Sequence, residues 1–236
     1  MITNTIKFLL LDLDGTLIKF DLDTFIQKYL FLIQDNFSNL PGAKSVPNWI
    51  LGGTAAMLNS LETITNKEKF LRFFQQKSGL SEEEIWEIFL HFYHTDYNKL
   101  KEITRPMQGA KTFLESAVVA EYEPVLATQP VFPEIAIRKR LVWAGLENIP
   151  FKLITHIENM KASKPHRQYY EQILNMLDSS GEECLMIGND IEMDMAAKQC
   201  GIQTYYLDAE NSNPKLYIEN ADDRGDFKKL AELLNI

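Results

Sequence analysis

Five short apolar runs, each ending in a polar residue, dominate the hydrophobic pattern of this chain. They cover residues 6–12, 124–129, 151–156, 184–190 and 203–208. Four to six apolar residues between turn-forming residues are typical of strands that are buried on both faces, as in a parallel sheet. The pattern therefore predicts five strands of a parallel sheet.

Helical patterns separate these runs after residue 124. The predicted helices cover residues 133–144, 165–177, 191–200 and 227–234. The first begins at a proline and ends before Gly145, residues that favour a helix start and a helix stop. Alternating strands and helices predict an open α/β sheet, and ligands of such sheets bind beyond the carboxyl ends of the strands.

A different pattern lies between the first and second runs. Residues 22–33 have the apolar spacing of an amphipathic helix, and two capping boxes, Thr65 to Glu68 and Ser81 to Glu84, precede further apolar periodicity. Further helices are predicted at residues 67–77 and 81–101. Pro47 and the Gly52-Gly53 pair are interpreted as turns, with the glycines either in a mobile loop that faces the active site or in a simple turn.

The predicted architecture is an α/β core, with a parallel sheet between two layers of helices, and an inserted α-helical cap. We expect the core to comprise residues 1–17 and 106–236 and the cap to comprise residues 18–105. Most of the aromatic residues of the cap are expected to form its own hydrophobic interior.

The amino-acid composition limits the kinds of partner and function that this chain can have. The 236 residues are 45% hydrophobic and 24% charged, which is ordinary for a globular protein. A net charge of −9 disfavours nucleic acid or an anionic membrane as the main partner, because both bind clustered lysine and arginine. Arg138, Lys139 and Arg140 are interpreted as the solvated face of a helix. No apolar run is long enough for a membrane helix and no signal peptide is evident, so a cytoplasmic protein is expected.

The strongest chemical signal is the segment Asp12-Leu13-Asp14-Gly15-Thr16, at the end of the first run. Gly15 permits a sharp turn, so that both carboxylates can converge on one centre. Like charges about 4 Å apart repel by roughly 4 kcal/mol at an effective dielectric constant of about 20, so the pair needs a counter-charge. Oxygen ligands of this kind suit Mg²⁺. Taken alone, two acids near a turn are also found in solvated loops.

This segment resembles the first motif of the haloacid dehalogenase-like hydrolase superfamily, most of whose members are phosphatases. The other three motifs of the superfamily appear in order at Thr128, at Lys164-Pro165, and at Gly188-Asn189-Asp190 with Asp194. The inserted helices match a C1-type cap in position. The resemblance implies a sheet order of 5-4-1-2-3, with strands numbered along the chain.

The resemblance also implies a role for each matching residue. Asp12 would attack phosphorus as the nucleophile, and Asp14 would serve as general acid and then general base. Thr128 would donate its hydroxyl group to a phosphoryl oxygen, and Lys164 would place a positive charge against the phosphoryl group and Asp12. Mg²⁺ would be held by Asp12, Asp190 and the backbone carbonyl group of Asp14.

The fourth motif departs from the common pattern. An aspartate usually follows the glycine, whereas here Asn189 occupies that position and the acid follows at Asp190. Asp190 is assigned as the metal ligand, with Asn189 and Asp194 supporting it. The alternative interpretation is that Asp190 and Asp194 simply cap the first turn of the helix that follows. Gln129 follows Thr128 where a smaller asparagine is common, and it is assigned to substrate binding.

The sequence thus predicts a Mg²⁺-dependent phosphatase that hydrolyses a small phosphorylated metabolite through an aspartyl-phosphate. Asp14 argues against haloacid dehalogenation, since dehalogenases of the superfamily lack an acid there. Two alternatives stay open: a sugar phosphomutase of the same superfamily, and a non-catalytic regulator that binds a phosphorylated metabolite. The physiological substrate and the oligomeric state are not specified by any motif.

Overall fold

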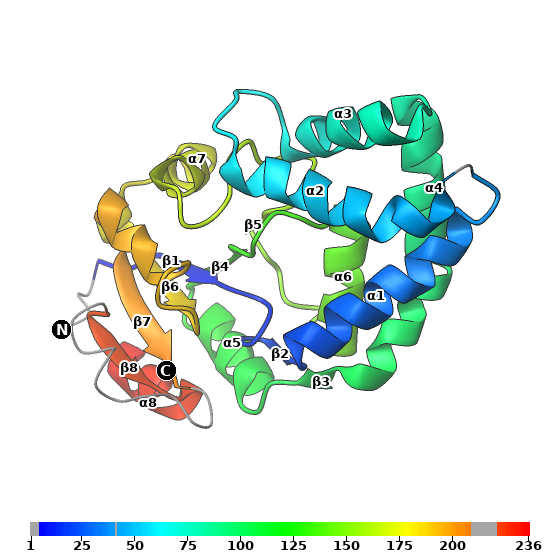
Figure 1. Cartoon of the computed structure of the whole chain (residues 1–236). Helices are drawn as coiled ribbons and strands as arrows, with labels where there is room; N and C mark the ends of the chain where they lie inside the picture. The colour runs from blue at the N-terminus through cyan, green and yellow to red at the C-terminus, as the bar shows by residue number, and fades with distance from the viewer. Residues whose placement is uncertain (1–4, 41, 209–220) are drawn as a thin grey trace.

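The computed structural model describes residues 5–40, 42–208 and 221–236. Within these residues the chain forms a six-stranded parallel sheet in the order β5-β4-β1-β6-β7-β8 (Figure 1). The strands are β1 (Phe8–Leu11), β4 (Glu123–Leu126), β5 (Leu153–Ile154), β6 (Cys184–Gly188), β7 (Gln203–Leu207) and β8 (Asp223–Gly225). The five predicted strands and their order are confirmed. The sequence pattern missed β8, because its residues Asp, Arg and Gly are polar or small.

Helices cover both faces of this sheet, because alternate strand residues point to opposite sides. Leu9 and Leu11 of β1 pack in one hydrophobic cluster with residues of α5, α6 and α8, whereas Phe8 and Leu10 pack in a second cluster with residues of α7. The four helices are α5 (Ala110–Val119), α6 (Glu134–Trp143), α7 (Arg167–Leu177) and α8 (Phe227–Leu234). None of the helices among the described residues is long and apolar enough to cross a membrane.

Residues 20–104 form a helical bundle, which lies on the opposite side of the molecule from β7 and β8 (Figure 1). Its helices are α1 (Leu22–Asn36), α2 (Val46–Asn59), α3 (Asn66–Ser78) and α4 (Glu82–His94), with 3₁₀ helices η1 (Ala43–Ser45) and η2 (Asp96–Ile103). Both predicted capping boxes are present, at the N-termini of α3 and α4.

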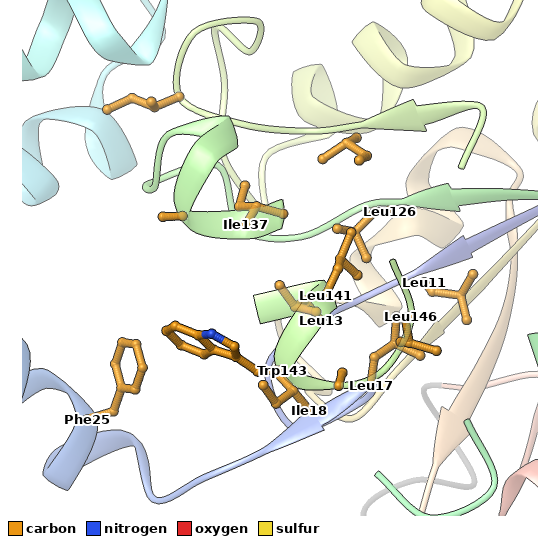
Figure 2. Close-up of a cluster of buried hydrophobic side chains, with 14 of the residues drawn as sticks. Leu11, Leu13, Leu17, Ile18, Phe25, Leu126, Ile137, Leu141, Trp143 and Leu146 are labelled. Atoms are coloured by element: carbon orange, nitrogen blue, oxygen red, sulfur yellow. The ribbon is translucent and has the colours of Figure 1, made fainter. Parts of the chain in front are cut away.

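An antiparallel ribbon of β2 (Ile18–Lys19) and β3 (Arg105–Pro106) joins the bundle to the rest of the chain. The predicted division into core and cap falls at this ribbon, and the division itself stays a prediction. One hydrophobic cluster extends from Leu11 and Leu126 of the sheet through Trp143 of α6 to Phe25 of α1 (Figure 2). The bundle and the sheet therefore share a continuous apolar interior.

The interpretation of Gly52-Gly53 as a turn or mobile loop is wrong, and so is that of Pro47. Pro47 stands in the first turn of α2, and both glycines lie inside this helix, where α2 packs against α3. A Cβ atom would lie 2.4 Å from the Phe73 ring at position 52 and 2.7 Å from the Phe70 ring at position 53. The glycines therefore let two helices approach closely.

Two predicted helices are shorter than the sequence pattern suggested. The helix expected at 81–101 ends at His94 and is followed by η2, while the helix expected at 191–200 is a 3₁₀ helix, η4 (Met195–Cys200), preceded by turns. Beyond this, a short 3₁₀ helix, η3 (Gly181–Glu183), precedes β6. The turns before η4 release Asp190 and Asp194 from helical geometry, which bears directly on the site.

Polar contacts that the sequence did not predict dock the start of α3 onto the loops beyond the sheet. The buried Asn66 side chain donates to the carbonyl oxygen of Pro130 (3.1 Å) and to Ser163 Oγ (3.2 Å). The ammonium group of Lys69, also buried, donates to the carbonyl oxygens of Ser60 (2.7 Å) and Lys161 (2.5 Å). These contacts fix the bundle over the carboxyl ends of the strands.

Candidate active site

The strands β1, β4 and β6 end at a cavity of about 490 Å³, whose opposite wall is formed by the helical bundle. All eight residues singled out from the sequence line it: Asp12, Asp14, Thr128, Gln129, Lys164, Asn189, Asp190 and Asp194. The four motif segments are thus brought together, as expected for residues at the carboxyl ends of neighbouring parallel strands.

Lys164 joins two carboxylates at the floor of the cavity. Its ammonium nitrogen lies 2.8 Å from Asp12 Oδ1 and 2.6 Å from Asp194 Oδ1, and Lys164 is only 2% exposed. Burial alone would lower the pKa of Lys164, but the charges of Asp12 and Asp194 outweigh it and raise the pKa well above its ordinary value. Lys164 is therefore held as a charged group against Asp12.

Asp194 is built into this arrangement rather than exposed on a helix. It is 1% exposed, and its second oxygen accepts a hydrogen bond from the Asp190 backbone N–H group (3.0 Å). Burial raises the pKa of Asp194, repulsion from Asp12 adds to the effect, and Lys164 opposes it. A Cβ atom at position 188 would lie 2.1 Å from Asp194 Oδ2, so the carboxylate can occupy this place only beside a glycine.

The side chain of Gln129 holds the main chain of Lys164. Its amide oxygen accepts from the Lys164 N–H group (2.9 Å), and its amide nitrogen donates to the Lys164 carbonyl oxygen (3.1 Å). The neighbouring Thr128 is held through its own carbonyl oxygen, which accepts from Thr155 Oγ1 (2.8 Å) and from the Tyr169 hydroxyl group (2.8 Å). Gln129 and Thr128 are thus fixed at the cavity, and their contact with substrate stays a prediction.

Asp14 has a partner that the sequence analysis misplaced. Its Oδ2 atom accepts from Arg140 Nη1 (2.5 Å), and Arg140 is 0% exposed, so the interpretation of Arg140 as solvated is wrong. The guanidinium group also packs on the Phe132 ring, 4.5 Å from its centre. Ile137 and Ala144, three residues before and four after Arg140, are both buried, so the helix spacing already placed this arginine on an apolar stripe.

The environment of Asp14 raises the pKa of its carboxyl group above the ordinary value. Burial raises the pKa of Asp14 and outweighs the attraction of Arg140, and the Asp12 charge acts in the same direction as burial. Oδ1 of Asp14 and two nitrogens of Arg140, Nε and Nη2, are buried and have no hydrogen-bond partner among the described residues. A carboxyl group with one oxygen free beside the nucleophile is suited to proton transfer.

The remaining predicted residues lie on the loop after β6. Asp190 is exposed, and its Oδ1 atom accepts from the N–H groups of Glu192 and Met193, both at 2.9 Å. Asn189 accepts a hydrogen bond from the Thr16 hydroxyl group (2.9 Å). Asn189 thus ties the loop after β6 to the turn after β1, while Asp190 faces the cavity from the solvent side.

The oxygen groups around Asp12 fit a hard cation that keeps much of its water shell. Among the described residues, no group of three or more His, Cys, Asp and Glu side chains is placed to form a metal cage. Mg²⁺ is commonly held by one or two carboxylates and retains several waters. The carboxylates of Asp12 and Asp190 and the carbonyl group of Asp14 are groups of this chemical kind, and their assignment as the metal ligands stays a prediction.

Comparisons with known proteins identify the family of this chain. A family model for haloacid dehalogenase-like hydrolases matches residues 6–201. Pyrimidine 5′-nucleotidase PynA of Streptococcus pneumoniae is 26% identical over 214 residues, which cover 85% of this chain and 83% of PynA.

Solved structures share the fold. A HAD phosphatase from Thermococcus onnurineus has a TM-score of 0.62 at 18% identity, over 97% of this chain and 98% of its own. The HAD-hydrolase YfnB of Bacillus subtilis, solved bound to magnesium, has a TM-score of 0.57 at 20% identity, over 98% and 99%. Because the family model spans most of the chain and its strand-end motifs line one cavity, this protein belongs to the haloacid dehalogenase-like hydrolase family.

Proposed function

We propose that this protein is a Mg²⁺-dependent phosphatase that hydrolyses a small phosphate monoester through an aspartyl-phosphate on Asp12. The observation that carries the proposal is the pairing of Asp12 with the buried Lys164 at the floor of a cavity. Lys164 contacts one oxygen of Asp12, so the other can approach phosphorus while the ammonium group offsets the phosphoryl charge.

The first chemical step forms the bond between Asp12 and phosphorus and breaks the ester P–O bond. Asp14, whose pKa is raised by burial, gives its proton to the departing alkoxide. Asp14 then takes a proton from water, the water oxygen attacks phosphorus, and the Asp12–phosphorus bond breaks to release phosphate. Arg140 keeps the Asp14 side chain in place throughout through its contact with Oδ2.

Asp12, Asp190 and the carbonyl group of Asp14 would hold Mg²⁺ in this scheme. When bound, the ion would supply positive charge that stabilises the phosphoryl group during transfer. Lys164 and the hydroxyl group of Thr128 bind the phosphoryl oxygens that remain.

The two alternatives, a sugar phosphomutase and a non-catalytic regulator, have structural requirements that the phosphatase does not share. A mutase must hold a bisphosphorylated intermediate, which requires a second cationic subsite. Lys164 is the sole Lys, Arg or His among the described residues that line the cavity. A regulator would need no general acid beside Asp12, yet Asp14 occupies that place with one oxygen free.

The test is hydrolysis of p-nitrophenyl phosphate by the wild type, Asp12→Asn and Asp178→Asn, with Mg²⁺ and with a chelator. Asp178 is an exposed residue in left-handed conformation at the end of α7, so its asparagine variant is a matched control. We expect activity that needs Mg²⁺, falls by roughly 10⁴-fold or more in Asp12→Asn, and is unchanged in Asp178→Asn.

Three results would contradict the proposal. Activity that survives in Asp12→Asn would exclude the nucleophile. Conversion of a sugar monophosphate to its isomer without release of phosphate would favour a mutase. Binding of phosphate esters with no turnover in Mg²⁺ would favour the regulator.

A further inference from the structure

The two walls of the active-site cavity differ in chemistry. The charged groups belong to the floor, at the strand ends, whereas none of the described cap residues that line the cavity is charged. The cap wall consists of aliphatic and aromatic side chains, and its polar side-chain groups are those of Thr54, Tyr29, Tyr93 and Trp86.

A chain of contacts between aromatic rings runs along this cavity. Phe132 lies after β4 beside Arg140, and the ring contacts continue from it into the bundle. The successive centroid distances are 5.6 Å for Phe132 to Tyr29, 6.4 Å for Tyr29 to Tyr93, 6.4 Å for Tyr93 to Phe89 and 5.3 Å for Phe89 to Phe70. All five residues line the cavity. A flat ring in the substrate would meet ring edges and faces here, which is a favourable arrangement for aromatic groups.

Three positively charged side chains could in principle neutralise a second acidic group of the substrate, but each is already paired with another group. Lys164 is paired with Asp12 and Asp194, and Arg140 is fully buried and paired with Asp14. The ammonium group of Lys67 lies over the Trp86 ring, 3.9 Å from the ring centre. Lys67 itself is not among the residues that line the cavity. A carboxylate or second phosphate under the cap would therefore lose water without gaining a counter-charge, which is strongly unfavourable.

The tyrosine pair provides one unused hydrogen-bond donor. The hydroxyl groups of Tyr29 and Tyr93 lie 2.8 Å apart, and both side chains are more than nine-tenths buried. Burial raises the pKa of both tyrosines, so each keeps its proton. Their mutual hydrogen bond uses one of the two protons, and the other has no acceptor among the described residues. The Thr54 hydroxyl group, by contrast, donates to the Ile50 carbonyl oxygen of its own helix (2.9 Å).

We infer that the substrate is a phosphate monoester of an uncharged alcohol that carries a flat ring, and that an acceptor on this alcohol receives the free proton of the Tyr29–Tyr93 pair. The inference rests on the proposed phosphatase function and adds the class of leaving group to it. Nucleoside monophosphates have this chemistry, whereas phosphorylated carboxylic acids and sugar bisphosphates do not.

The test compares four esters of primary alcohols, whose leaving groups have similar intrinsic reactivity. Uridine 5′-monophosphate carries a ring and acceptors, 2-phenylethyl phosphate carries a ring alone, glycerol 3-phosphate has no ring, and phosphoglycolate has a carboxylate. We expect kcat/KM for the two ring-bearing esters to exceed that for the other two by about 10- to 100-fold, as burial of a ring implies. Equal or better hydrolysis of phosphoglycolate or glycerol 3-phosphate would overturn the inference.

A double variant tests the hydroxyl pair separately. Tyr29→Phe with Tyr93→Phe removes both hydroxyl groups, keeps both rings and leaves neither partner unsatisfied, so the fold should be little affected. We expect kcat/KM for uridine 5′-monophosphate to fall about 5- to 10-fold, with 2-phenylethyl phosphate unchanged as the internal control. An equal fall for both esters, or no fall for uridine 5′-monophosphate, would contradict the assigned donor.

A binding measurement tests the inferred substrate class independently of the proposed phosphatase activity. If no ester is hydrolysed in Mg²⁺, the phosphatase proposal fails, and calorimetry with Asp12→Asn then decides the inference. Tighter binding of uridine 5′-monophosphate and 2-phenylethyl phosphate than of phosphoglycolate would uphold it. Tighter binding of phosphoglycolate, or binding of none of the esters, would overturn it.

Discussion

The floor and the cap wall of the cavity both contain buried polar groups, yet they are stabilised in opposite ways. On the floor, Asp12, Lys164 and Asp194 form a chain of opposite charges. In the cap, aromatic packing dominates, and the buried polar pair of Tyr29 and Tyr93 is neutral. Charges in a low-dielectric setting are useful where charge develops during a reaction, while an uncharged wall accepts an uncharged part of the ligand.

Because of this difference, the residues expected to carry out the reaction and the residues expected to select the substrate come from different parts of the chain. The floor is assembled from residues on the loops that follow strands. Asp12, Thr128 and Asn189 lie within two residues of a strand end, while Lys164 and Asp194 lie farther along their loops. The cap wall is assembled from residues on α1, α2, α3 and α4, whose faces meet only when the bundle packs. Substitutions on the floor should therefore act on kcat, and substitutions in the cap should act on KM and on stability.

Lys164 and Lys69, the two buried lysines among the described residues, provide the strongest test of this separation. Lys164→Met leaves Asp12 and Asp194 facing each other and removes a charge next to the phosphoryl group. We expect kcat to fall by about 10²- to 10³-fold, roughly 3–4 kcal/mol of transition-state stabilisation.

Lys69→Met is the matched variant in the cap. Lys69 is as buried as Lys164, but its ammonium group meets carbonyl oxygens of Ser60 and Lys161 instead of carboxylates. We expect it to lose about 2 kcal/mol of stability by thermal denaturation, with kcat retained at a temperature where the variant stays folded. Comparable losses of kcat in both variants would mean that cap and floor are not separable.

Arg140 provides the second test, because it lies where floor and cap meet. Arg140→Met leaves the half-buried carboxyl group of Asp14 without its partner, and we expect a loss of about 1–3 kcal/mol of stability. We expect Asp14→Asn combined with Arg140→Met to recover part of this stability, since the amide carries no charge. Denaturant unfolding of the two single variants and the double variant measures the coupling, and strict additivity would show that the pair contributes nothing.

The contacts of Asn66 provide a smaller test. Asn66→Asp keeps the shape of the side chain but replaces its donor with a carboxylate oxygen facing Pro130 O and Ser163 Oγ. We expect Asn66→Asp to lose about 2–3 kcal/mol of stability and Asn66→Ala to lose less, about 1–2 kcal/mol, because alanine adds no repulsion. The reverse order in thermal unfolding would show that the docking of α3 does not depend on this donor.

The strand-end residues could be predicted because their signals are local. The apolar run before Asp12, the glycine after Asp14 and the proline after Lys164 each determine structure within a few residues. Arg140 was missed although its signal was also local, since its neighbours Ile137 and Ala144 show that it lies on the buried side of α6.

Other features could not have been predicted from a single sequence. Tyr29 and Tyr93 are 64 residues apart, and Asn66 meets Ser163 across 97 residues, so neither contact has a local pattern. Gly52 and Gly53 were misread because a glycine pair usually breaks a helix, and only the packing of α3 shows why this helix needs small residues.

These glycines provide the test with the smallest expected effect. Alanine at position 52 and alanine at position 53 should change the stability by different amounts. Alanine in place of glycine inside a helix is favoured by about 1 kcal/mol. At position 52 the added methyl group meets the tip of Phe73, a partly exposed ring that can move, so Gly52→Ala should change stability by less than about 1 kcal/mol. At position 53 it meets Phe70, which is buried and lines the cavity.

Gly53→Ala should therefore lose about 1–2 kcal/mol despite the gain in helix propensity, because a buried ring must be displaced. For a chain of this size the melting temperature should fall by about 2–8 °C. Displacement of the Phe70 ring toward the cavity should also raise KM for ring-bearing esters more than for glycerol 3-phosphate, with kcat unchanged. If Gly53→Ala shifts kcat instead, the aromatic wall of the cap must be coupled to the charges on the floor, and the separation of selectivity from chemistry in this cavity fails.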